Sequence, residues 1–388
     1  MKLMPSPTCC CRYFRKSVVN WEIMKFHRKF GRPALSGFLL AFLLLTVSLK
    51  EWAQDRPASS TVLKAGRPVT KSMAGKDRHL YTVHLKKGMY LGLSVEQRDV
   101  DVLTEVFDPN SKSMGKFDAP TSERGTERIR IGAEVTGDYR IDVSTSSELA
   151  GPGKYKLEIT ALNQMNARDK RVLMAVGLQQ EAIRLRSKAD KRKDAISVYV
   201  KAVEIWRELR LPADEANTLR SIAFVYQRAD RIDKAREYFG KALEIWERIG
   251  DVRSAAFTHV IYGGYSRKQN DFQPALEHDL RARQLWLKAD DKPEQTHNLV
   301  QIGNDHLSLG HKAEALEHFQ KALDLVRRIG RKSIEALVLS EYGDAKAKLG
   351  NKAEALAMYR QSAALWKSFK QDKIAADVEE KIVKLSAN

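Results

Sequence analysis

Cysteine is nearly absent from this chain of 388 residues. The three cysteines that it has, Cys9, Cys10 and Cys11, lie together near the N-terminus, so residues 12–388 contain no thiol. A disulfide framework, a thiolate metal site and a cysteine nucleophile are therefore excluded from that part of the chain.

The sequence also lacks the usual motifs of phosphate and metal chemistry. Gly263-Gly264 is not followed by the Gly-Lys-Ser/Thr of a phosphate loop. The nine histidines are scattered, and none has the paired spacing with a glutamate that binds zinc on a helix. We therefore predict no catalytic residue, no metal ligand and no cofactor, and we expect that the protein is not an enzyme.

Calcium is an alternative for four oxygen-bearing residues, Asp99, Asp101, Asp108 and Asn110. They would supply suitable ligands if their loops met at one end of a β-domain. Turn formation explains Asp108 and Asn110 equally well, because such side chains bond to the backbone of their own turn.

The net charge of +18 resembles that of a nucleic-acid-binding protein, but its distribution indicates otherwise. Residues 1–50 contain nine lysines and arginines and one acid, so +8 of the charge lies there and +10 in the rest of the chain. That remainder is mostly interleaved with acidic residues, which is typical of solvated helix surfaces. We expect no nucleic-acid partner.

From Asp194 to Trp366 one pattern recurs every forty residues. Two columns of small residues stand seven positions apart, on one helix face, with an aromatic between them in four of five copies and a large apolar residue after them. The small columns are Ala195, Ala235, Ala275, Ala315 and Ala355, then Ala202, Ala242, Ala282, Ala322 and Ser362; between them are Tyr199, Phe239, Asp279, Phe319 and Tyr359, and after them Trp206, Trp246, Trp286, Val326 and Trp366.

A second pattern precedes each unit by twelve residues. It consists of an apolar residue followed by alanine or glycine, in Ile222-Ala223, Tyr262-Gly263, Ile302-Gly303 and Tyr342-Gly343. Each unit is thus predicted to be two amphipathic helices that approach closely at their small residues. Since neither helix can bury its apolar face alone, the units are expected to stack into a solenoid.

At these residues the array resembles tetratricopeptide repeats. The segments "SIAFVY" from Ser221 and "KAREYFGKALEIW" from Lys234 fit that family's pattern best. The period of forty exceeds the usual thirty-four, which implies longer helices. The resemblance implies about five long units over residues 163–370 and a capping helix over residues 371–388.

Between residues 55 and 162 the apolar period changes from helical to two, which indicates half-buried strands. Turn residues separate the runs, and the spacing suggests an antiparallel β-sandwich of seven or eight strands. The residues expected to face its core are Tyr81, Val83, Leu85, Leu91, Leu93, Val95, Ile129, Ile131, Ala133, Tyr139, Ile141, Val143, Tyr155, Leu157 and Ile159.

The strand segments "HLYTVHLKKGMYLGLSVEQ" and "VTGDYRIDV" are similar to the pre-peptidase C-terminal type of β-sandwich, an accessory module of exported bacterial proteins. The order of the two domains along the chain resembles the N-terminal part of bacterial proteins that join this sandwich to tetratricopeptide repeats and a caspase-like CHAT peptidase. The sequence ends before such a peptidase would begin. The predicted fold is therefore an all-β antiparallel sandwich followed by an α-helical repeat solenoid.

Residues 1–54 have the layout of a leader. A basic segment precedes residues 34–49, which are sixteen residues without a charge. Sixteen helical residues fall short of the roughly 20 that span a bilayer, so a cleaved signal is favoured over an anchor. The protein is expected to be periplasmic or extracellular, or tethered to the inner membrane through residues 34–49 if the signal stays. Translation could start at Met1 or at Met24.

The function expected is that of a scaffold or adaptor. In tetratricopeptide arrays the first helix of each pair lines a concave surface that binds a protein or peptide. Alternatives are the regulatory front of a split CHAT-type peptidase system, or glycan binding by the sandwich. Matching the units predicts these partner-binding residues: Asn217, Arg220, Gln227, Arg267, His297 and Asn304.

Overall fold

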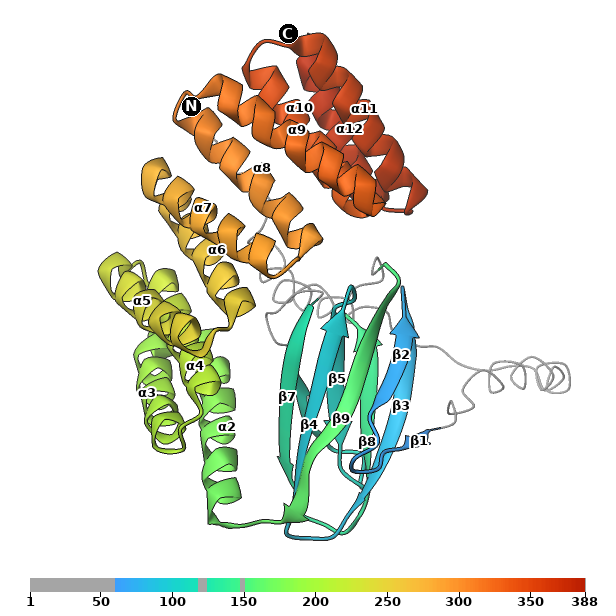
Figure 1. Cartoon of the computed structure of the whole chain (residues 1–388), viewed down its shortest axis with the longest axis vertical. Coiled ribbons are helices and arrows are strands. Elements are labelled where there is room, and N and C mark those ends of the chain that lie inside the picture. The colour runs from blue at the N-terminus through green and yellow to red at the C-terminus, as the bar shows by residue number, and fades with distance from the viewer. Residues whose placement is uncertain (1–59, 118–123, 147–150, 388) are drawn as a thin grey trace, which may run out of the picture. The chain divides into compact units, whose positions relative to one another are not determined.

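The computed structural model describes residues 60–117, 124–146 and 151–387. In this part of the chain, strands come first and helices follow (Figure 1). The predicted leader, with its apolar stretch at residues 34–49, lies outside the described residues. None of the described helices is long and apolar enough to cross a membrane.

The β-domain consists of two sheets, ordered β1-β3-β8-β5-β6 and β2-β9-β4-β7. Neighbouring strands are antiparallel except for the short edge strand β1, which is parallel to β3. The strands are β1 (Thr61–Val62), β2 (Val69–Met73), β3 (Arg78–Leu85), β4 (Met89–Arg98), β5 (Val102–Phe107), β6 (Ser113–Phe117), β7 (Arg124–Gly132), β8 (Gly137–Thr145) and β9 (Gly153–Gln164).

Strand alternation places one apolar face of each sheet inward. All the residues that the period of two assigned to the interior are buried in one core to which both sheets contribute. Burying one face per sheet against the other is the arrangement that stabilises an antiparallel sandwich. The predicted fold class is confirmed for this part of the chain.

The helices follow as antiparallel pairs, α2 with α3 through α10 with α11, and α12 covers the last pair (Figure 1). Equivalent helices begin forty residues apart, at Pro212, Val252, Lys292 and Lys332. The helices are α2 (Ala167–Arg186), α3 (Arg192–Glu208), α4 (Pro212–Arg228), α5 (Ile232–Ile249), α6 (Val252–Lys268), α7 (Phe272–Lys288), α8 (Lys292–Ser308), α9 (Lys312–Ile329), α10 (Lys332–Lys348), α11 (Lys352–Ser368) and α12 (Asp372–Ala387).

Close packing within each pair depends on the small residues. A Cβ added at Gly303 would lie 3.0 Å from the ring of Phe319, and one at Gly343 would lie 2.7 Å from the ring of Tyr359. All residues of the two small columns are fully buried, and those of the Trp/Val column are nearly so. The tryptophans are therefore part of the core between helices, as predicted.

Helix ends recur every twenty residues in a left-handed backbone conformation. Glycine supplies this conformation at Gly250, Gly310, Gly330 and Gly350, which the sequence had marked as helix ends. At five other ends the same conformation is adopted by non-glycine residues: Asp230, Asn270 and Asp290, whose side chains tolerate it, and Arg210 and Lys370, which rarely take it.

The β-domain and the first helix pair share a buried contact, and residues 61–388 form one compact unit. Tyr90 of β4 packs in one apolar cluster with Val172 of α2 and Trp206 of α3. Beside it, the guanidinium of Arg130 donates two hydrogen bonds of 2.8 Å to the carboxylate of Asp214. Paired donors on a planar carboxylate fix orientation as well as distance, so this contact defines how α4 begins.

Replacing Ala242 by phenylalanine tests the helix register. Ala242 is fully buried, and the larger ring would overpack the contact of α5 with its neighbours. We expect Ala242→Phe to lower the free energy of unfolding by about 1–3 kcal/mol. Chemical denaturation measures this loss. The matched control Glu244→Phe, at an exposed position of the same helix, should change stability by less than about 0.5 kcal/mol.

Candidate functional site

Two columns of residues on the first helices of the pairs, seven positions apart, are half-exposed in every copy from α4 to α10, as is a third column of Gln227, Arg267, Leu307 and Ala347. They differ in chemistry from pair to pair, whereas the packing columns are nearly constant, with Asp279 as the main exception. The first column is Asn217, Phe257, His297 and Leu337, and the second is Phe224, Gly264, Asn304 and Asp344. These positions form the candidate binding surface, here called the inner strip.

Arg220 was predicted to reach a partner, but its side chain lies within the fold. Only 3% of the residue is exposed. Its guanidinium donates a 2.8 Å hydrogen bond to Oδ1 of Asn217 and lies 5.3 Å from the ring centre of Phe257. A cation over an aromatic face is attracted by the ring quadrupole. Arg220 therefore links the first residues of the inner strip on α4 and α6.

Arg267 is also directed inward, toward two carboxylates. Its Nη1 donates to Asp279 of α7 and, at 2.9 Å, to Oδ2 of Asp305 of α8. Both aspartate side chains are fully buried, and 16% of the Arg267 side chain is exposed. Asn298 adds a hydrogen bond of 3.4 Å to Oδ1 of Asp279. We call these four residues the polar cluster.

The polar cluster is not electrically balanced when both carboxylates are ionised, because one guanidinium faces two of them. Burial raises the pKa of Asp279. Burial, opposed by Arg267 and reinforced by Asp279, raises the pKa of Asp305 to about 8. Near neutral pH, therefore, the pair of carboxylates retains one proton, which reduces the charge that the interior must hold.

The other predicted binding residues lie nearer the surface. Gln227, His297 and Asn304 are half-buried. Asn304 donates a 3.1 Å hydrogen bond to Glu341 of α10, so the inner strip has a polar link between successive pairs. Farther along, Asp344 accepts hydrogen bonds of 2.7 Å from Tyr359 and from Lys381 of α12.

Histidines of consecutive helices meet in the array. Nδ1 of His259 lies 2.9 Å from Nδ1 of His278, whose ring stacks on Tyr262. Burial lowers the pKa of each of the two histidines to about 4, so both are neutral near pH 7. A second group joins His306 to His311, with His306 stacked on His318. Spacing within one helix could not reveal either contact.

The described residues contain no group of three His, Cys, Asp or Glu side chains placed to hold a metal ion. The calcium alternative was wrong as a four-residue site. Asp99 and Asp101 precede β5 while Asp108 and Asn110 follow it, and a strand of six residues separates its ends by about 20 Å. Asp108 instead accepts hydrogen bonds from the backbone of Asn110 and Lys112 in its own turn.

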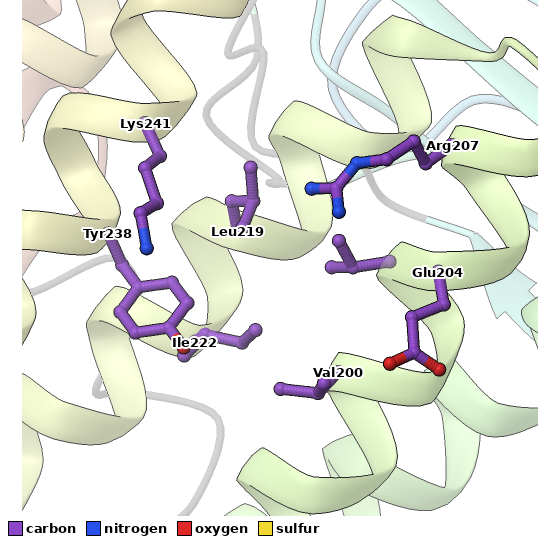
Figure 2. Close-up of a pocket in the computed structure, with 8 residues that line it drawn as sticks. Val200, Glu204, Arg207, Leu219, Ile222, Tyr238 and Lys241 are labelled. Carbon is purple, nitrogen blue, oxygen red and sulfur yellow. The ribbon is translucent and has the colours of Figure 1, made fainter.

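A pocket of about 230 Å³ opens between α3, α4 and α5 (Figure 2). Valine, leucine, isoleucine and tyrosine side chains form its apolar part, and Glu204, Arg207 and Lys241 its charged part. Arg207 is already paired with Glu215, and Lys241 with Glu237. Arg207 thus links α3 to α4, whereas Lys241 is paired within α5, and the residues that line the pocket include no paired acid and base at reacting distance.

The model of the tetratricopeptide repeat family matches four overlapping segments, residues 184–248, 214–288, 254–328 and 295–368. The array is therefore made of tetratricopeptide repeats, as the sequence pattern predicted. No curated protein sequence matches the chain.

Solved structures are similar at low identity. Aspartyl phosphate phosphatase F from Bacillus subtilis is 15% identical with a TM-score of 0.47, and covers 55% of this chain. RapI in its apo form is 18% identical with a TM-score of 0.48, and also covers 55%. The chain spans 56% and 58% of the length of these two proteins.

The β-domain also has a similar structure. The pre-peptidase C-terminal domain of a collagenase from Bacillus anthracis is 17% identical, with a TM-score of 0.23. It covers 27% of this chain, and 99% of that domain is matched.

The polar cluster can be tested by exchanging it for the residues of the next pair. Arg267→Leu alone leaves two buried carboxylates without their cation, and should lower the free energy of unfolding by about 3–5 kcal/mol. Adding Asp279→Phe and Asp305→Ala reproduces Leu307, Phe319 and Ala345 of the next pair, and should recover most of this loss. Denaturant titration of both variants measures the difference; a single variant as stable as the parent would contradict the inward role of Arg267.

Proposed function

We propose that this protein is a non-enzymatic, exported scaffold or adaptor that binds a protein or peptide partner along the inner strip. The observation that carries this proposal is the contrast between two kinds of column. Packing columns repeat small and aromatic residues because every pair must approach in the same way. The half-exposed columns instead change from amide to aromatic, imidazole and aliphatic, as a surface that recognises a particular sequence would.

The inner strip offers both kinds of contact that peptide recognition uses. Phe257 and Leu337 provide apolar surface, while Asn217, His297 and Asn304 provide hydrogen-bonding groups. In this proposal Gln227 contributes a further amide at the edge of the strip. Arg220 acts by holding Asn217 and Phe257 in place, and Arg267 acts from inside the array through the polar cluster.

Export belongs to the same proposal. It is supported by the basic and apolar order of residues 1–54 and by the resemblance of the β-domain to accessory modules of exported proteins. The protein would work in the periplasm or outside the cell. It would be tethered to the inner membrane through residues 34–49 if the signal were retained.

Site-specific photo-crosslinking tests the binding surface. Benzoylphenylalanine at position 257 keeps an aromatic ring on the inner strip, and the same residue at position 280 places the probe on an exposed site of α7. In the cells that produce the protein, we expect a covalent partner adduct from position 257 in at least several-fold excess over position 280. Equal adducts at both positions, or none at position 257, would rule out the inner strip as the binding surface.

The alternative function is the regulatory front of a split or truncated CHAT-type peptidase system. The order of sandwich and repeats favours it by resemblance. This alternative predicts a His/Cys peptidase encoded directly downstream, whereas the scaffold proposal does not require one. Reading the neighbouring DNA and co-purifying the two products distinguishes them, since a peptidase that gains activity with this chain would support the alternative.

A further inference from the structure

Three columns change character at once in the third and fourth helix pairs. Asp279 stands in the column that holds Tyr199, Phe239, Phe319 and Tyr359. Arg267 and Asp305 likewise stand in columns that are uncharged in the other pairs, with Gln227, Leu307 and Ala347 in one and Val225, Tyr265 and Ala345 in the other. These three departures are the charged residues of the polar cluster, so they compensate one another in space.

The polar cluster lies at a boundary in the apolar core. One set of buried clusters draws its members from α2–α7, and another from α8–α12. Among the described residues the two sets share no member. Asp279 belongs to α7 and Asp305 to α8, so their contacts through Arg267 cross this boundary.

Hydrogen bonding in the polar cluster is incomplete. Oδ1 of Asp305 and Oδ1 of Asn298 are buried without a hydrogen-bond partner. A buried acceptor that has no hydrogen bond costs roughly 1–3 kcal/mol of stability, and more when it is charged. An aromatic ring at position 279 would carry no such cost, so the stability of this contact depends on the charge state of the two carboxylates.

We infer that the contact between α7 and α8 is a pH-sensitive joint, closed by one proton held between Asp279 and Asp305 and opened when that proton is released. Opening separates the two apolar sets without unfolding either, because contacts in a repeat array are made between neighbours. The inner strip crosses this joint, between Phe257 on α6 and His297 on α8. The inference concerns the array itself and does not depend on the proposed function.

The direction of the pH effect follows from the closed and open states. In the closed joint the pKa of Asp305 is raised to about 8, whereas the exposed group titrates near its ordinary value of 3.8. The closed state thus binds the proton more tightly, and its stability falls as pH rises from about 4 toward 8 and is then constant. Charged groups facing the pair are Arg267 from α6 and the two carboxylates themselves. His259 and His278, on α6 and α7, remain neutral over most of this range.

Hydrogen exchange of the full chain, read by mass spectrometry and corrected for the intrinsic pH dependence of exchange, tests the joint. Between pH 5.5 and 7.5 the local opening of peptides from α7 and α8 should increase by up to about tenfold per pH unit. Peptides from α4–α5 and α10–α11 are the internal reference, and we expect their local opening to change much less with pH. Equal slopes in all four regions, or none in α7 and α8, would overturn the inference.

Matched variants assign the slope to the proton. Asp305→Asn should abolish it at α7 and α8, while Asp344→Asn, an aspartate variant on α10 outside the polar cluster, should leave it unchanged. If Asp305→Asn does not fold, Asp279→Asn serves the same purpose, because it also leaves one carboxylate for one guanidinium. If the pH dependence of opening at α7 and α8 persists in the variant that folds, another group controls the joint.

Discussion

Close approach of a small residue to an aromatic ring is the contact on which the whole array depends. At Gly303 and Gly343 no Cβ could be added without displacing Phe319 or Tyr359. The ring fills the space between the two helices of a pair, and the alanine columns let the next helix pack against it. Because this contact recurs every forty residues except where Asp279 replaces the ring, the first helices of the pairs keep a constant phase.

Constant phase has a functional consequence, since it returns the same two columns of each first helix to a half-exposed position. Those columns carry no packing duty common to all pairs and can differ in chemistry. Arg220 connects these half-exposed columns to the packed interior, because it joins Asn217 on α4 to Phe257 on α6 from a buried position. A partner on the inner strip would therefore meet side chains whose orientation is already fixed.

Features that depend on one element could be predicted from the sequence. The forty-residue period gave the helix pairs, and the alternation of Tyr139, Ile141 and Val143 gave an inward strand face that the structure confirms. Helix ends were predicted only where glycine marks them. At Arg210 and Lys370 the left-handed turn is imposed by the helices on either side, and no local signal of residue type announces it.

Features that depend on two elements could not be predicted in the same way. Arg267 was assigned to the binding surface by its position in the unit, but its orientation is determined by Asp279 and Asp305 on two other helices. His259 and His278 meet for the same reason. A sequence signal did exist, in the missing aromatic at position 279. An absent ring leaves a volume that something must fill, and a buried carboxylate there requires a cation nearby.

The polar cluster raises the question of how a repeat array tolerates an interior that is less favourable than the apolar one in its other pairs. Energies in such arrays add between neighbours, so the cost of Asp279 is confined to the contacts of α6, α7 and α8. The apolar clusters on either side draw their buried members from different helices. An aromatic residue at position 279 would make the packing here resemble that of the other pairs, and the array would lose the buried charged contact that Arg267 makes with α7 and α8. The polar cluster thus lowers local stability and marks a boundary between two apolar regions of the solenoid.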